Sequence, residues 1–216
     1  MTQSKSGFYF LKNKKWIFFF LLMIFFFLFA KTILQKGTFS FDQTIFDLVG
    51  KIRSTQVTAI FKVITNLASL PALIIYCILI YSNSFTRKHG NLAVINLGII
   101  ITFNYLLKLI FARERPFGIA LIEETGYSFP SGHSMVSMAY FGLLIYLIHQ
   151  ENLSNMKKNI LIFLFSLLIL SIGVSRIYLG VHYPSDVIGG FFLSIAYLIV
   201  FTHLVNNYKK NRSVEV

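Results

Sequence analysis

Residues 16–34, WIFFFLLMIFFFLFAKTIL, form an almost unbroken apolar run that decides the class of fold. A helix of this length crosses the roughly 30 Å of hydrocarbon in a bilayer and satisfies its own backbone hydrogen bonds there. Lys31 is the one charged residue in the run, and its long side chain can reach the membrane surface. The run lacks a small-residue cleavage site, which favours a retained membrane helix over a cleaved signal peptide.

Five further apolar segments predict additional spans, so we expect an all-α integral membrane protein built as a bundle of six transmembrane helices. The composition agrees, because 56% of the 216 residues are hydrophobic and 13% are charged, against about 25% charged in ordinary soluble domains. The predicted spans are residues 16–34, 63–81, 92–112, 131–148, 160–175 and 185–205. The membrane domain is thus expected over residues 16–205, between cytoplasmic tails at 1–15 and 206–216.

The segment between the first two predicted spans, residues 39–53, has a different pattern. Its apolar residues recur at helical spacing, at Phe41, Ile45, Leu48, Val49 and Ile52. Charged residues lie between them, at Asp42, Asp47, Lys51 and Arg53. This pattern predicts an amphipathic helix on the outer membrane surface. A plain connecting role for it is favoured over a role in gating the substrate.

The distribution of basic residues predicts the orientation of the bundle, because cytoplasmic loops of membrane proteins are rich in Lys and Arg. A cytoplasmic N-terminus places eleven of the twenty basic residues on that side: Lys5, Lys12, Lys14, Lys15, Arg87, Lys88, Lys157, Lys158, Lys209, Lys210 and Arg212. Both termini are then cytoplasmic. The short tails and the abundance of Lys, Ile, Asn and Phe indicate the plasma membrane of a low-GC bacterium.

The net charge of +12 does not indicate a nucleic-acid partner. The basic residues are scattered between the spans and form neither a continuous stripe nor a known binding motif. Attraction to the anionic headgroups of membrane lipids explains the charge better. The sequence indicates no obligate protein partner.

Three short polar clusters interrupt the apolar chain: Lys108 with Arg115-Pro116, then Pro130-Ser131-Gly132-His133, then Ser175-Arg176 with His182 and Asp186. Charged groups are costly inside or beside a membrane, so such clusters are read as functional. The predicted topology brings all three clusters to the outer face. The fourth span begins at residue 131 on this outer face. The free backbone N–H groups at the start of a helix favour binding of an anion.

Spacing within the clusters predicts how their side chains meet. Lys108 and Arg115 are two helical turns apart and would share one face of a helix. His182 and Asp186 are four residues apart, so they share a face if both are helical, and Asp186 can instead serve as an N-terminal charge. A carboxylate bonded to one imidazole nitrogen leaves the other nitrogen free to attack, which is the arrangement of an activated nucleophile.

In order and spacing, the three clusters resemble the signature of the type 2 phosphatidic acid phosphatase (PAP2) superfamily. The resemblance implies a six-helix, metal-independent lipid phosphatase that works through a phosphohistidine intermediate. By motif position, it implies that His182 attacks phosphorus, that Asp186 orients it, and that His133 protonates the leaving oxygen. The groups implied to hold the phosphoryl oxygens are Lys108, Arg115, Ser131, Gly132 and Arg176.

This inventory suits the chemistry, because phosphoryl transfer depends on positioning and on neutralising charge on the phosphoryl oxygens. Three fixed cations could supply the field that other phosphatases obtain from divalent ions. The sequence holds no additional cluster of carboxylates and histidines with metal spacing, so we expect neither a metal nor another cofactor.

Among lipid phosphates, undecaprenyl diphosphate is the favoured substrate. It is released on the outer face, where the site is predicted, whereas phosphatidylglycerol phosphate is made on the cytoplasmic face. Phosphatidylglycerol phosphate or phosphatidate comes next. Two alternatives on the same scaffold are a non-hydrolytic lipid-binding or transport protein and a lipid phosphotransferase. The intact histidines and Asp186 argue against the first, and the second would use the same intermediate.

Overall fold

The computed structural model describes residues 3–82 and 87–212, and within them the regular elements are helices joined by loops. The elements are α1 (Gln3–Lys36), α2 (Ser40–Lys51), α3 (Thr55–Asn66), α4 (Leu70–Ser82), the short 3₁₀ helix η1 (Arg87–His89), α5 (Gly90–Phe111), α6 (Gly132–Gln150), α7 (Asn155–Tyr178) and α8 (Pro184–Arg212). The predicted all-α class is confirmed. At the ends of the chain, α1 and α8 continue into the segments predicted as tails, of which residues 1–2 and 213–216 lie outside the described residues.

Five of these helices, α1, α5, α6, α7 and α8, are long and apolar enough to cross a membrane. The predicted second span, residues 63–81, is instead divided between α3 and α4, which are bent by 50° at a short break. Pro71 lies in the first turn of α4 and has no N–H to donate to the carbonyl of Leu67, so a continuous helix is disfavoured there. Counted as one broken span, α3 and α4 complete the six.

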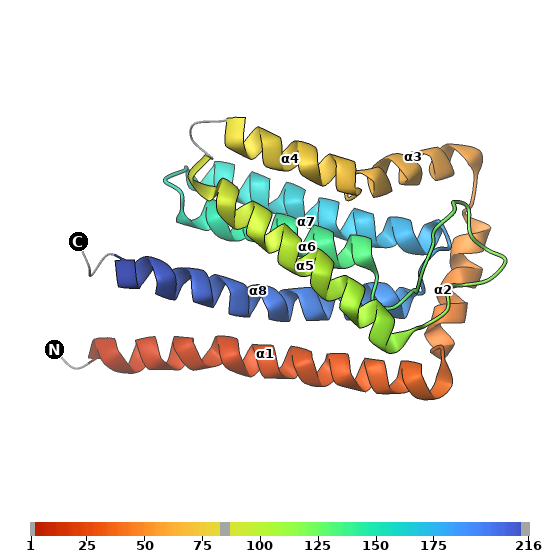
Figure 1. Cartoon of the computed structure of the whole chain (residues 1–216), viewed down its shortest axis with the longest axis horizontal. Coiled ribbons are helices and arrows are strands. Elements are labelled where there is room, and N and C mark those ends of the chain that lie inside the picture. Colours follow the sequence, from red (N-terminus) through yellow and green to blue (C-terminus); the bar gives the residue numbers. More distant parts are fainter. Residues whose placement is uncertain (1–2, 83–86, 213–216) are drawn as a thin grey trace.

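Helix α6 lies at the centre of the bundle and packs against α5, α7 and α8, while α1 packs along α8. The buried faces of α6 and α8 carry small residues such as Ser134, Ala139 and Ser194, which allow membrane helices to approach closely. Both termini lie at one end of the bundle, and α2 with the loop between α5 and α6 lies at the other (Figure 1).

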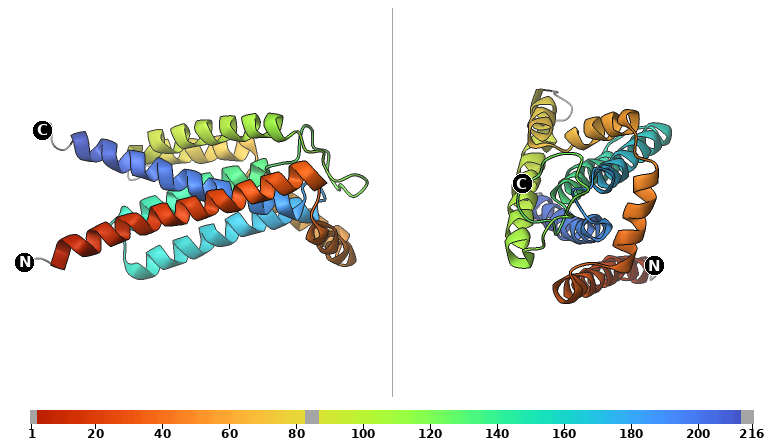
Figure 2. Two further views of the ribbon diagram at one scale, coloured as in Figure 1. Left: turned by 90° about the horizontal axis from the view of Figure 1, so that it is seen from below. Right: turned by 90° about the vertical axis from the view of Figure 1, so that its right-hand side faces the viewer.

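The predicted amphipathic helix is present as α2, which runs across the end of the bundle from α1 towards α3 (Figure 2). Its buried face differs from the apolar pattern in the sequence. Leu48 and Ile52 are 57% and 61% exposed, whereas Asp42 and Phe46 are buried. The burial of a carboxylate here has a structural reason, because Asp42 accepts hydrogen bonds from groups at the start of α8 and in the α5–α6 loop.

Candidate active site

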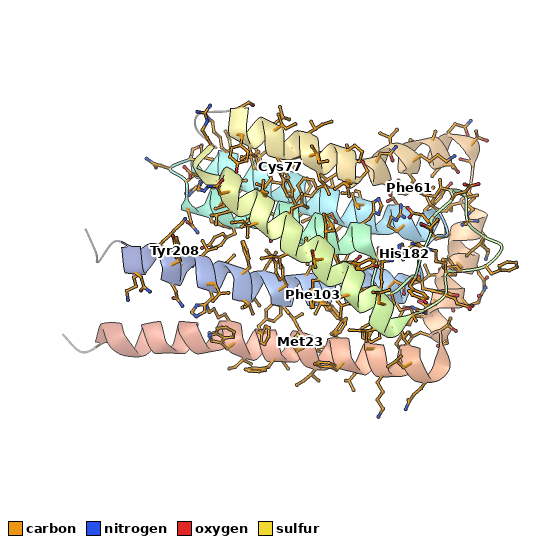
Figure 3. All side chains as sticks on the ribbon, viewed as in Figure 1. Met23, Phe61, Cys77, Phe103, His182 and Tyr208 are labelled. Carbon is orange, nitrogen blue, oxygen red and sulfur yellow. The ribbon has the colours of Figure 1, made fainter. Side chains whose placement is uncertain are left out.

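His182 lies in the turn between α7 and α8, at the end of the bundle away from the termini (Figure 3). Gly180 makes this turn possible. Its φ of +71° is in the left-handed region, and a Cβ at this position would lie 2.3 Å from the carbonyl oxygen of Ile119. Only glycine fits both conditions. The turn therefore packs directly against the α5–α6 loop.

The hydrogen bonds around His182 indicate which ring nitrogen carries the proton. Its Nδ1 lies 3.4 Å from Asp186 Oδ2 and 3.4 Å from Ser128 Oγ. Its Nε2 lies 3.2 Å from Nη1 of Arg115. Because a guanidinium can only donate, Nε2 accepts this bond and Nδ1 carries the hydrogen. The lone pair of the buried imidazole thus faces a cation.

Lys108 and Arg115 converge, although not on one helix face as predicted. Helix α5 ends at Phe111, and Ala112 turns the chain with a left-handed φ of 44°. Both cations then bind carbonyl groups of the same loop: Lys108 Nζ donates to Tyr127, and Arg115 Nε donates to Gly126 at 3.0 Å. The loop replaces the helix as the element that gathers the charges.

Arg176 joins these two cations from the last turn of α7. Its buried guanidinium donates from Nη1 to Thr65 Oγ1 at 2.6 Å and from Nη2 to the carboxylate of Glu124. The same carboxylate lies 3.8 Å from Nη2 of Arg115. Glu124 therefore sits where two of the predicted phosphate-binding cations meet.

The Pro130–His133 segment begins α6 as predicted, with Ser131 as the N-terminal cap and Gly132 as the first helical residue. The backbone N–H of Ser131 donates to the carbonyl of Asp186 at 3.2 Å, which ties the start of α6 to the start of α8. A Cβ at Gly132 would lie 3.0 Å from Asn104 Oδ1 and 4.0 Å from Lys108 Cε. The helix N-terminus therefore lies next to the cation cluster. His133 follows in the first turn and is half-buried.

Comparison with known proteins identifies the family that carries this site. Residues 48–210 match the PAP2 superfamily. The chain belongs to this superfamily. It is 32% identical to phosphatidylglycerophosphatase B of Bacillus subtilis over 78% of this chain and 85% of the relative. It is 31% identical to the undecaprenyl-diphosphatase BcrC of the same organism over 57% of this chain and 62% of the relative.

A solved structure gives the same assignment. The crystal structure of a transmembrane PAP2-type phosphatidylglycerolphosphate phosphatase from Bacillus subtilis superposes with a TM-score of 0.80 at 27% identity, covering 88% of this chain and 96% of the other. The chain is thus a multi-pass membrane phosphatase of the PAP2 superfamily. Within residues 3–82 and 87–212, no group of three or more His, Cys, Asp or Glu is arranged to hold a metal ion.

Four residues of this PAP2 site were missed by sequence reasoning. They are Asp42, Arg113, Glu124 and Ser128, and each bonds directly to a predicted site residue or to Arg113. Glu124 stands in the α5–α6 loop, where acidic residues are ordinarily exposed to solvent. For two of the other residues the sequence offered only a weak signal: Arg113 stands two residues before Arg115, and Asp42 is one of two acidic residues before residue 114. Neither position shows which cation meets which carboxylate.

The electrostatics of the site keep His182 neutral and Glu124 charged. Burial lowers the pKa of His182 well below its ordinary value of 6.5, and the charges of Arg176 and Arg115 lower it further. Burial alone would raise the pKa of Glu124, but the charge and hydrogen bond of Arg176 outweigh it, so that this pKa is lowered. A neutral imidazole and an ionised carboxylate therefore coexist beside the cations.

We expect the imidazole of His182 to be neutral, with its hydrogen on Nδ1, at pH 6.5, where an ordinary histidine is half protonated. Because burial and the nearby cations lower the pKa of His182, its imidazole binds a proton only at a pH below 6.5. Nitrogen-15 NMR of histidine-labelled protein in detergent measures the titration midpoint and the position of the ring hydrogen. The His182→Gln variant assigns the signal. A titration midpoint at or above 6.5 would contradict the geometry.

Proposed function

We propose that this PAP2 phosphatase removes a terminal phosphate from membrane lipids, with undecaprenyl diphosphate as the preferred substrate and phosphatidylglycerol phosphate or phosphatidate next. The observation that supports this most is the orientation of His182. Its Nδ1 faces Asp186, and its Nε2 faces Arg115 at 3.2 Å. A neutral nitrogen lone pair aimed into a group of cations suits attack on an anionic phosphoryl group.

The proposed reaction has two steps. Nε2 of His182 attacks phosphorus, the bond from phosphorus to the lipid oxygen breaks, and His133 donates a proton to that oxygen. Asp186 stabilises the positive charge that develops on the phosphorylated imidazole. Water then attacks phosphorus, its proton passes to His133, and inorganic phosphate leaves while the lone pair returns to His182. No step of this scheme uses a metal ion.

The phosphoryl oxygens would bind to Lys108, Arg115 and Arg176 and to the backbone N–H of Gly132. In the structure, Lys108 and Arg115 donate to loop carbonyls, and Arg176 donates to Thr65 and Glu124. A phosphate that offers several charged oxygens competes well for such donors, because charge-assisted bonds are stronger than those to neutral carbonyls. Ser131 Oγ accepts a bond from Ser134 at 2.9 Å, which leaves its own O–H to donate to phosphate.

The orientation of the chain supports the order of substrates. The candidate site, marked by His182, and the two termini lie at opposite ends of the bundle (Figures 1 and 3). If the basic terminal segments are cytoplasmic, as the distribution of Lys and Arg favours, the site faces the outer side of a bacterial plasma membrane. Undecaprenyl diphosphate is released on that side. The relative named phosphatidylglycerophosphatase B, matched over 85% of its length, supports the second substrate.

Phosphate release in detergent with excess EDTA tests both the activity and the absence of a required metal. We expect release from undecaprenyl diphosphate and, at a lower kcat/KM, from phosphatidylglycerol phosphate and phosphatidate, with the same rates before and after EDTA. Release that depends on a divalent ion would contradict the mechanism. Folded protein that releases phosphate from none of the lipids would favour binding or transport, and transfer of the phosphate to an added alcohol in preference to water would favour a phosphotransferase.

A further inference from the structure

Helix α2 inserts one carboxylate, Asp42, beneath the candidate active site. The side chain is buried, with a residue exposure of 1%. Its Oδ1 accepts the backbone N–H of Ser185 at 2.9 Å, and its Oδ2 accepts the Ser185 hydroxyl at 2.8 Å. Oδ2 also accepts Nη2 of Arg113 at 3.2 Å. Asp42 thus contacts both the start of α8 and a cation of the α5–α6 loop.

Arg113 connects this carboxylate to the catalytic pair. Its Nη1 donates to Asp186 Oδ1 at 2.5 Å and to Ser185 Oγ at 2.9 Å. The ring of Tyr183 covers the guanidinium, with its centroid 4.0 Å from Cζ. The planar fork of Arg113 is therefore held between two carboxylates, one from α2 and one from α8, and it cannot rotate without breaking several bonds.

The fork determines which oxygen of Asp186 faces the nucleophile. Because Oδ1 is engaged by Arg113, Oδ2 is left for Nδ1 of His182 at 3.4 Å. The Ser128 hydroxyl and the backbone N–H of Tyr183, at 2.8 Å, also donate to Oδ2. If the Asp186 carboxylate could rotate, Oδ1 would no longer be reserved for Arg113 and Oδ2 for His182.

Charge balance gives Asp42 a second effect. With both carboxylates ionised, they and Arg113 would sum to one net negative charge on the Nδ1 side of His182, opposite the cation Arg115 at Nε2. Without Asp42, the charge of Arg113 would cancel that of Asp186, and the imidazolium formed during phosphoryl transfer would lose its counter-charge. In a buried site, solvent and salt screen the interactions between charges only weakly, so the loss of this counter-charge would have a large effect.

We propose that Asp42 is a positioning residue of the phosphatase: through Arg113 it holds the Asp186 carboxylate in place against His182. Asp42 touches neither the substrate nor the reacting atoms. Helix α2 is then a required part of the active site as well as a connection between spans. The proposal rests on the proposed function, in which His182 is the nucleophile.

The test compares Asp42→Asn with Asp47→Asn, a matched change at an exposed position of the same helix. We expect Asp42→Asn to lower kcat about 10- to 100-fold, the size of loss caused by removing a partner that orients a metal-binding histidine. KM should not change, because the lost interaction acts only in the transition state. Asp47→Asn should behave as the wild type. Thermal unfolding of each variant in detergent verifies that the protein compared is folded.

An anchoring role for Asp42 without a positioning role predicts a different result: folded Asp42→Asn protein with the kcat of the wild type, which would overturn the proposal. If Asp42→Asn does not fold, Arg113→Lys decides, since it keeps the charge but loses the fork. Lowered kcat at unchanged KM supports the proposal, and unchanged kcat overturns it. Wild type and His182→Ala are assayed in parallel. An inactive wild type, or an active His182→Ala, would instead contradict the proposed function.

Discussion

Replacement of His182 by alanine is expected to reduce phosphate release from undecaprenyl diphosphate by about 10⁶-fold, the loss typical of removing a nucleophile that acts within a catalytic unit. The reason is structural: Nε2 of His182 is the proposed attacking atom, and its lone pair already faces Arg115. The initial rate of phosphate release in detergent measures the effect.

His149→Ala is the matched control, because His149 is an exposed histidine in the last turn of α6, far along that helix from the Gly132 end. We expect this variant to keep the activity of the wild type. A folded His182→Ala protein with activity within tenfold of the wild type would show that another group attacks phosphorus.

The second large effect is expected for Asp186→Asn, which should lower kcat by about 10⁴-fold, the loss seen when the orienting aspartate of a Ser-His-Asp triad becomes asparagine. Asp186 Oδ2 accepts from the Nδ1 side of His182. An amide N–H in its place would donate to Nδ1 and move the ring hydrogen to Nε2, where it would block the attacking lone pair. Steady-state kinetics with the same lipid measure the loss.

Asp186 is also bonded to Arg113, Ser128 and the backbone of Tyr183, so the folding of the variant must be measured alongside its activity. A soluble, folded Asp186→Asn protein that keeps kcat within tenfold of the wild type would contradict the orienting role. A kcat that falls with unchanged thermal stability would support it.

The membrane-spanning helices could be predicted from the sequence, because contact with lipid requires long apolar segments. Four predicted spans correspond to the single helices α5 to α8, and the first corresponds to α1. The exception is the second span, where hydropathy alone does not reveal the break between α3 and α4. Pro71 was the local signal of that break, because its missing N–H ends the hydrogen-bond ladder.

The gathering of the three polar clusters at one end of the bundle could be predicted from the sequence. Successive membrane spans run in opposite directions, so the end of one span and the start of the next lie on the same side of the membrane. The route by which residues converge was less predictable. Lys108 and Arg115 meet through loop carbonyls rather than a shared helix face. The link from Asp42 through Arg113 joins positions 71 residues apart, and a carboxylate on an amphipathic helix is ordinarily exposed. Its burial depends on tertiary partners that no local pattern shows.

Isolation of the phosphorylated enzyme is the most direct test of the account. Wild-type protein would be mixed with terminally phosphorus-32-labelled undecaprenyl diphosphate, quenched in alkali within one turnover, and digested for mass spectrometry. We predict label on the imidazole of His182, stable in alkali and released by acid, and none in His182→Ala. Full turnover with no labelled enzyme, or label on another residue, would contradict the proposed phosphohistidine mechanism.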